Sequence, residues 1–134
     1  MSSDANLAAV QRIYEAFGRG DVPAILDELA DDVAWDVDAP SYGVPIYEPG
    51  TGKDHVQRFF GELQGLEFHT FQPTNFLVGG DQVAVTIDID VTVKATGRTA
   101  RALEIHLWTF GDDGRVTRFF HAIDRHAFVL AYGA

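Results

Sequence analysis

Three ionisable residues in the last third of the chain have the types and the spacing for proton-transfer chemistry. Glu104, His106 and His121 lie among bulky aromatic residues, on the two sides of the turn signal Gly-Asp-Asp-Gly at 111–114. If the apolar runs that flank this turn pair as a hairpin, Glu104 comes roughly opposite His121, and His106 lies one step away on the same face. A carboxylate beside two imidazoles on an inward face either costs stability or does chemistry.

The chemical interpretation gives each of these residues a role. We predict His121 as the general acid or base, because the ordinary pKa of histidine, ~6.5, lies near working pH. Glu104 would fix the tautomer of His121 and raise its basicity. His106 would donate a hydrogen bond to a substrate carbonyl or enolate, as an oxyanion stabiliser.

Two alternatives remain open for the same residues. In the first, Glu104 and His121 satisfy each other as a buried network beneath aromatic residues. In the second, two imidazoles and one carboxylate hold zinc or iron. No His-x-His or His-x-x-x-Glu spacing on one strand supports a metal site, so we expect no metal and no cofactor.

The strands that must position these residues follow from hydrophobic alternation. Residues 83–93 alternate strictly between apolar and polar types, so Asp88 and Asp90 are predicted on the outer face rather than as a metal pair. The same parity in the next strand places Glu104 and His106 inward with two aromatic residues, at 108 and 110. Residues 33–38 also alternate, which predicts Asp36 in solvent, together with the aspartate two positions later.

Helices are predicted for most of the first half of the chain. Apolar residues at helical spacing indicate a helix from about Asp4 to Gly18. Asp21 is the expected cap of a second helix that ends before the acidic pair at 31 and 32. A capping-box-like pattern over residues 51–54 begins the third helix after the loop at 39–50. Asp124 is predicted to cap a short C-terminal helix.

This order of elements predicts the fold class. Three helices with one early strand between them precede four long antiparallel strands, at 66–78, at 83–94 and on the two sides of the hairpin 99–124. We therefore expect an α+β fold in which helices cover one face of a curved sheet.

Composition narrows the functional class. The chain has 134 residues, 46% of them hydrophobic, which predicts one folded domain over residues 1–134. The sequence contains no cysteine, which excludes disulfides and thiolate chemistry. A net charge of −10 argues against nucleic acid and anionic membranes as partners. With no signal peptide and no membrane-spanning apolar run in the sequence, we expect a cytoplasmic protein.

Several segments together resemble one known family. They are IYEAFGRGD at 13–21, LADDVAW at 29–35, GTGKDHVQRFF at 50–60 and WTFGDDGRVTRFFHAIDRHAF at 108–128. Their order is similar to that of the SnoaL-like and ketosteroid-isomerase-like members of the nuclear transport factor 2-like superfamily. The resemblance implies a cone-like, mixed or antiparallel curved sheet wrapped around three N-terminal helices, with one deep apolar pocket. It also implies a homodimer formed through the outer face of the sheet, and it speaks against metal dependence.

The family's catalytic residues carry over only in part. By the resemblance, the isomerase tyrosine falls on Ile13, beside Tyr14, the isomerase base falls on Val37, and the oxyanion aspartate falls on His106. Two of these three roles are not matched, so we do not predict steroid isomerisation. The resemblance to cyclases and epoxide hydrolases puts their last-strand acid or base on His121.

The sequence therefore predicts a cofactor-independent acid/base enzyme for a small hydrophobic carbonyl-containing substrate, of cyclase, isomerase or dehydratase type. The alternative is a non-catalytic protein that binds an apolar small molecule. Tyr14 is either a core tyrosine or a hydrogen-bond donor that points into the pocket. The predicted substrate-binding residues are Tyr14, Trp35, Val37, Phe60, Ile89, Trp108, Phe119 and Ile123.

Overall fold

The computed structural model of this protein describes residues 3–133. The helices are α1 (Ser3–Gly18), α2 (Val22–Leu26), α3 (Lys53–Glu62) and α4 (Arg125–Tyr132), with 3₁₀ turns at Pro45–Tyr47 and Leu63–Gly65. The strands are β1 (Leu29–Trp35), β2 (Gly50–Thr51), β3 (Leu66–Gly79), β4 (Gln82–Val93), β5 (Thr99–Phe110) and β6 (Val116–Ala122). None of the helices in this part of the chain has the length and apolar character needed to span a membrane.

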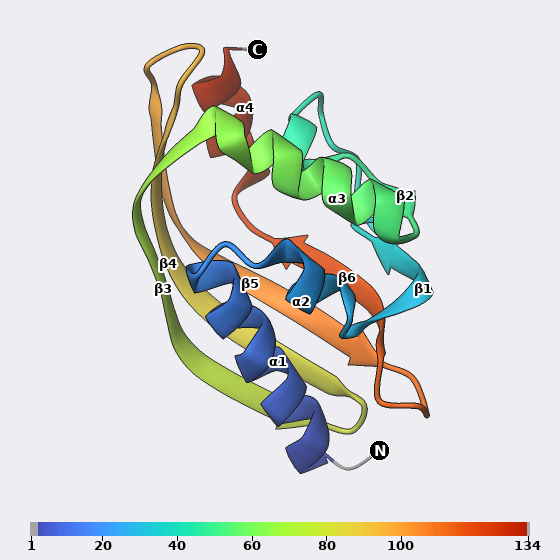
Figure 1. Ribbon diagram of the computed structural model, residues 1–134. Helices are drawn as coiled ribbons and strands as arrows, with labels where there is room; N and C mark the ends of the chain where they lie inside the picture. Colours follow the sequence, from blue (N-terminus) through green and yellow to red (C-terminus); the bar gives the residue numbers. More distant parts are fainter. Residues whose placement is uncertain (1–2, 134) are drawn as a thin grey trace.

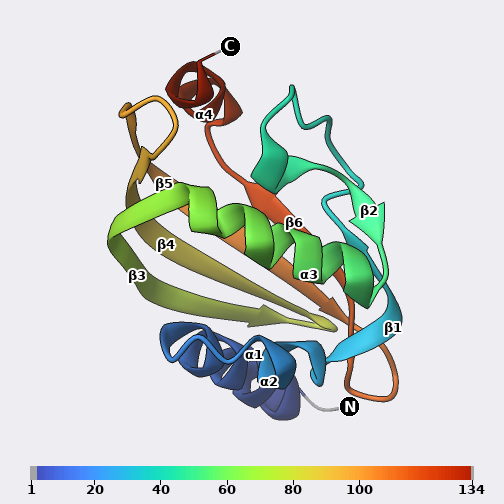
Figure 2. The ribbon, with the colours of Figure 1, turned by 45° about the horizontal axis from the view of Figure 1, so that its top comes forward.

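The strands form one curved, mixed sheet in the order β2-β1-β6-β5-β4-β3. Neighbouring strands pair antiparallel, except that β1 runs parallel to β6. Helices α1, α2 and α3 all lie on the concave side of this sheet (Figures 1 and 2). The expected α+β fold, with a curved sheet around three N-terminal helices, is confirmed.

The alternation in β4 and β5 sets which side chains enter the interior. The apolar members of β4, from Val83 to Val93, are buried, and its aspartates face away from them. Strand β5 pairs with β4 in continuous register, with Val85 opposite His106 and Ile87 opposite Glu104. Since directly paired residues share a face, the two ionisable side chains enter the same interior as the valines and isoleucines.

Helix α4 lies beside the β4–β5 turn (Figure 2). Its N-cap is Asp124, whose carboxylate accepts a hydrogen bond from the backbone N–H of Ala127 at 3.1 Å, as predicted. Its last turn is held to the β4–β5 turn, because the Thr96 hydroxyl donates to the Ala131 carbonyl at 2.6 Å. The polar start of α4 therefore lies next to the C-terminal end of β6.

Two local predictions were wrong. The first strand begins at Leu29, which we expected to be helical, and it ends at Trp35 rather than at residue 38. The third helix has Gly52 as its N-cap, with no side-chain capping bond, so the predicted capping box does not form. Gly52 has a φ of 89°, a conformation that favours glycine, so the turn geometry rather than a threonine side chain starts α3.

Candidate active site

The site is centred on a buried, hydrogen-bonded pair, Asp36 and His121. One oxygen of Asp36, Oδ1, accepts the backbone N–H of His121 at 2.8 Å, and the other, Oδ2, lies 2.6 Å from His121 Nδ1. The Asp36 side chain is 0% exposed and that of His121 is 4% exposed. An ionised carboxylate accepts hydrogen bonds only, so Nδ1 carries a proton, and in the neutral imidazole the lone pair is on Nε2.

The burial of Asp36 overturns the prediction that it faces solvent. Strand β1 ends at Trp35, and Asp36 has a φ of 55°, in the left-handed region. This turn interrupts the alternation, so the side chain of Asp36 points inward like that of the preceding tryptophan, which is also buried. Aspartate tolerates this conformation better than most residues do. A strand followed by Asp-Val-Asp-Ala-Pro was the available signal, since a proline-containing loop makes strict alternation unreliable at its edge.

The register between β5 and β6 also differs from the prediction. His106, not Glu104, lies directly opposite His121, and an irregularity between Thr109 and Phe110 shifts the pairing near the turn. The two imidazoles are 5.0 Å apart between ring centres and nearly perpendicular. Glu104 is then the diagonal neighbour of His121 on the same face, and it does not fix the Nδ1 tautomer, because Asp36 holds that nitrogen.

His106 is the end of a chain of polar contacts that begins on β5 and passes through α1. The indole N–H of Trp108 donates to the Tyr14 hydroxyl at 3.1 Å, and that hydroxyl lies 2.6 Å from His106 Nδ1. The hydroxyl can accept from Trp108 and donate to Nδ1, which places the single N–H of the neutral imidazole on Nε2, towards Glu104. Burial lowers the pKa of His106 and outweighs the opposing influence of Glu104, so the imidazole is neutral.

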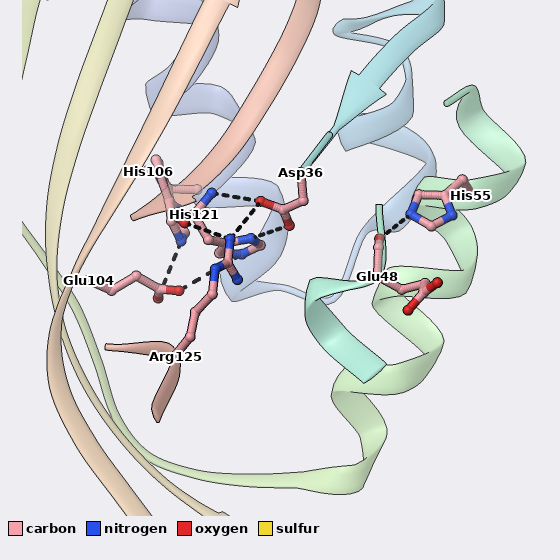
Figure 3. A network of polar contacts seen from close by, with 8 residues as sticks. Asp36, Glu48, His55, Glu104, His106, His121 and Arg125 are labelled. Carbon is pink, nitrogen blue, oxygen red and sulfur yellow. Dashed lines mark hydrogen bonds and ion pairs between the residues drawn. The ribbon is translucent and has the colours of Figure 1, made fainter. Parts of the chain in front are cut away.

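Glu104 faces both imidazoles (Figure 3). Its Oε2 is 3.3 Å from His106 Nε2, and its Oε1 is 3.8 Å from His121 Nε2. Burial alone would raise the pKa of Glu104, but the contact with His106, together with His121 and Arg125, more than offsets it and lowers the pKa. Glu104 is therefore a buried carboxylate that stays charged, and it faces the open nitrogen of His121.

Arg125, the first residue of α4, supplies a positive charge to the site that no pattern in the sequence indicated. Its Nη2 donates to the His121 carbonyl at 3.1 Å and lies 3.8 Å from Asp36 Oδ1. The guanidinium lies over the ring of Tyr47, 4.5 Å from its centre. The positive charge of Arg125 partly balances the two buried carboxylates, and it reaches them only because α4 folds back onto β6.

A small cavity adjoins these groups. Its volume is about 50 Å³, and it is lined by Glu104, His106 and His121 together with the predicted residues Tyr14, Trp35, Phe60, Ile89, Trp108 and Phe119. This volume is enough for a few water molecules but far below the ~300 Å³ of ordinary ligand sites. A substrate therefore requires the aromatic walls to move.

Two predicted lining residues lie elsewhere. Val37 is 41% exposed, because the left-handed turn at Asp36 sends it outward. Ile123 is half-buried against the core but does not line the cavity, since β6 ends at Ala122. Tyr14 both lines the cavity and hydrogen-bonds with His106, so its hydroxyl is satisfied and also reaches the site.

An adjoining hollow suggests where a ligand would enter. It has a volume of about 280 Å³ and shares Phe17, Ile25, Phe60, Leu63, Leu66 and Phe68 with the walls of the inner cavity. The shared residues come from α1, α2, the end of α3 and the start of β3.

Comparison with known proteins agrees with this architecture. The profile of the SnoaL-like domain family matches residues 10–119, and no curated protein matches the chain in sequence. A nuclear transport factor 2-like protein of unknown function from Burkholderia pseudomallei is 31% identical over 100% of both chains, with a TM-score of 0.80. A nuclear transport factor 2-like protein from Burkholderia xenovorans is 25% identical over 98% of both chains, with a TM-score of 0.85.

A third solved structure contains a small molecule. TerC, co-crystallised with polyporic acid, is 26% identical over 97% of this chain and 99% of its own, with a TM-score of 0.76. The family profile covers most of the chain, and the first of these structures matches it from end to end. The chain belongs to the SnoaL-like domain family of the nuclear transport factor 2-like superfamily.

Proposed function

We propose that this protein is an acid/base enzyme that transfers a proton on a small hydrophobic carbonyl-containing substrate, in a cyclisation, isomerisation or dehydration. The observation that carries the proposal is the Asp36–His121 pair on the wall of an apolar cavity. Asp36 holds the proton on Nδ1, so Nε2 of His121 is free to accept a proton from substrate. Proton transfer of this kind needs no cofactor.

The neighbouring residues complete a reaction cycle. When His121 takes a proton from the carbon next to the carbonyl, an imidazolium and an enolate form. The imidazolium is stabilised by Asp36 at 2.6 Å and by Glu104 at 3.8 Å. The enolate oxygen requires a donor, and neutral His106 is suited to this because its N–H faces the same space. His121 then returns the proton to another atom of the substrate.

The small-molecule nature of the substrate has two supports. The cavity walls are almost entirely aromatic and aliphatic apart from the three ionisable residues. TerC, a similar structure, was co-crystallised with polyporic acid, so a relative of comparable fold holds an organic compound. We infer that the substrate of this protein is also a compact apolar molecule with one carbonyl group.

The proposal can be tested without knowing the natural substrate. Alkyl and aryl ketones of graded size are incubated with the protein in D₂O and a metal chelator, and loss of the α-proton signal is followed by NMR. We expect exchange with the ketones that fit, and a fall of about 10²–10⁴-fold in His121→Gln. His69→Gln is the matched control, since that histidine is exposed and its Nε2 pairs with the Thr92 hydroxyl.

The result also separates the two candidate functions. A His121→Gln variant that folds normally and exchanges at the wild-type rate would refute the catalytic role of His121. Ketones that bind, shown by shifted resonances of Trp108 and Phe119, but do not exchange would favour the non-catalytic binding protein. That second function is consistent with the narrow, apolar cavity.

A further inference from the structure

Nε2 of His121 and a carboxylate oxygen of Glu104 face each other inside this protein. In the neutral imidazole Nε2 carries the lone pair, because Nδ1 donates its proton to Asp36 at 2.6 Å. The atom that Nε2 faces is Oε1 of Glu104, at 3.8 Å, which is too far for a hydrogen bond. Both side chains are buried. A lone pair opposite a carboxylate in a buried space is unfavourable, and either a proton or a metal ion between them removes the repulsion.

A third ligand atom points to the same place. Nε2 of His106 lies 3.3 Å from the other oxygen of Glu104, and among residues 3–133 it is a buried atom with no hydrogen-bond partner. One donor atom from each of Glu104, His106 and His121 lies within 4.8 Å of the others. The carboxylate and one imidazole come from β5 and the second imidazole comes from β6, so the pairing of these two strands brings the three ligands together, as the sequence predicted.

The separations are close to those of a metal centre. Zinc binds nitrogen and oxygen at about 2.0–2.2 Å in tetrahedral geometry, which places neighbouring ligand atoms ~3.3 Å apart. The two contacts of Glu104, at 3.3 and 3.8 Å, are near this value, but the three ligand atoms together lie within 4.8 Å of one another, so the site must contract around the ion. Ordinary side-chain rotation supplies such a movement in a site that adjoins a cavity.

The Nδ1 atom of each imidazole, the ring nitrogen that faces away from Glu104, already has a hydrogen-bond partner. Asp36 lies 2.6 Å from Nδ1 of His121, and the Tyr14 hydroxyl lies 2.6 Å from Nδ1 of His106. Histidines that bind metals almost always donate their other ring N–H to such a partner, which fixes the ring. Metal binding at Nε2 of His106 therefore requires its proton to move to Nδ1, which then donates to the Tyr14 hydroxyl. Asp36 and Glu104 contribute two negative charges and Arg125 one positive charge, so a divalent ion meets a net negative site.

We infer that Glu104, His106 and His121 form a binding site for one divalent transition-metal ion, with zinc preferred. Nε2 of each imidazole and a carboxylate oxygen of Glu104 are the ligands, and the fourth position faces the apolar cavity. This inference goes beyond the proposed acid/base function and competes with it. The ion and the substrate proton use the same lone pair of His121, so a bound ion would inhibit proton transfer.

Direct metal binding tests the inference. Tag-free protein is dialysed against a chelator and then titrated with Zn²⁺ by calorimetry. We expect one ion per chain, and a dissociation constant at least tenfold larger in Glu104→Gln and in His106→Gln. His69→Gln, at an exposed histidine, is the matched control and keeps wild-type affinity.

A second measurement uses only the wild-type chain, so it does not depend on whether the variants fold. Co²⁺ added to the wild-type chain should give visible absorption bands typical of four-coordinate nitrogen and oxygen ligands, and Zn²⁺ should abolish them. The inference is overturned if wild-type protein takes up no stoichiometric ion, or if folded Glu104→Gln binds zinc as tightly as wild type. Either failure leaves the acid/base proposal intact, because the exchange assay is run with chelator.

Discussion

Replacing Asp36 probes the buried pair most directly. In Asp36→Ala, both donors of His121, the backbone N–H and Nδ1–H, lose their acceptor in a buried place. Each unsatisfied donor costs about 1–3 kcal/mol. Alanine at a φ of 55° adds about 1–2 kcal/mol of backbone strain. We therefore expect the free energy of unfolding to fall by about 3–8 kcal/mol, a large part of the ~5–15 kcal/mol typical of a domain.

Two further variants divide this loss into its causes. Asp36→Gly removes the same hydrogen bonds without the backbone strain, so it should be more stable than Asp36→Ala by about 1–2 kcal/mol. Asp36→Asn keeps an acceptor for the backbone N–H and tolerates the left-handed turn. Its amide NH₂ would face Nδ1 of His121 and move the imidazole proton to Nε2. We expect it to be folded, with ketone exchange lowered by about 10³–10⁴-fold.

Urea denaturation followed by tryptophan fluorescence measures the stabilities, and ¹⁵N NMR of labelled histidine reports the tautomer of His121. Asp38→Ala is the control, because Asp38 is an exposed aspartate paired with Arg118 at the surface and should change stability little. The reasoning is refuted if the free energy of unfolding of Asp36→Ala lies within ~1 kcal/mol of the wild-type value. It is refuted equally if Asp36→Asn leaves the proton on Nδ1.

Three other predictions concern tyrosines and the sheet surface. Tyr14→Phe should lower stability by about 1–3 kcal/mol, because Trp108 Nε1 loses its acceptor; unchanged urea unfolding would contradict this. Burial raises the pKa of Tyr47 well above 10, so the unfolded chain ionises first, and stability falls as pH rises above 10. Tyr47→Phe should lessen that alkaline loss without lowering stability at neutral pH, since the hydroxyl is buried without a partner among residues 3–133; unfolding curves at pH 7 and 11 decide it. The expected homodimer should dissociate in Leu103→Asp, because Leu103 pairs with Asp88 on the outer face and is 58% exposed; light scattering that gives one unchanged mass would contradict this.

Much of the fold followed from local pattern. The strict alternation of β4 identified its inward valines and isoleucines, and the same parity placed Glu104 and His106 inside β5. The caps at Asp21 and Asp124 were also predicted correctly, because a capping side chain bonds within three residues of itself. Such features depend on neighbours in the sequence, so the sequence alone determines them.

The composition of the site depended on contacts that no local pattern encodes. Asp36 entered the interior because one left-handed residue at the end of β1 interrupted the alternation, and the same turn sent Val37 outward. The pairing of Phe110 with Val116 at the turn and the register irregularity next to it each shifted the strands by one position, which put His106, not Glu104, opposite His121. Arg125 arrived through the packing of α4 on β6. The sequence determined which face is inside, because alternation has a fixed period, whereas the partners of His121 were decided by tertiary structure, because one turn and one bulge each move a side chain by a whole position.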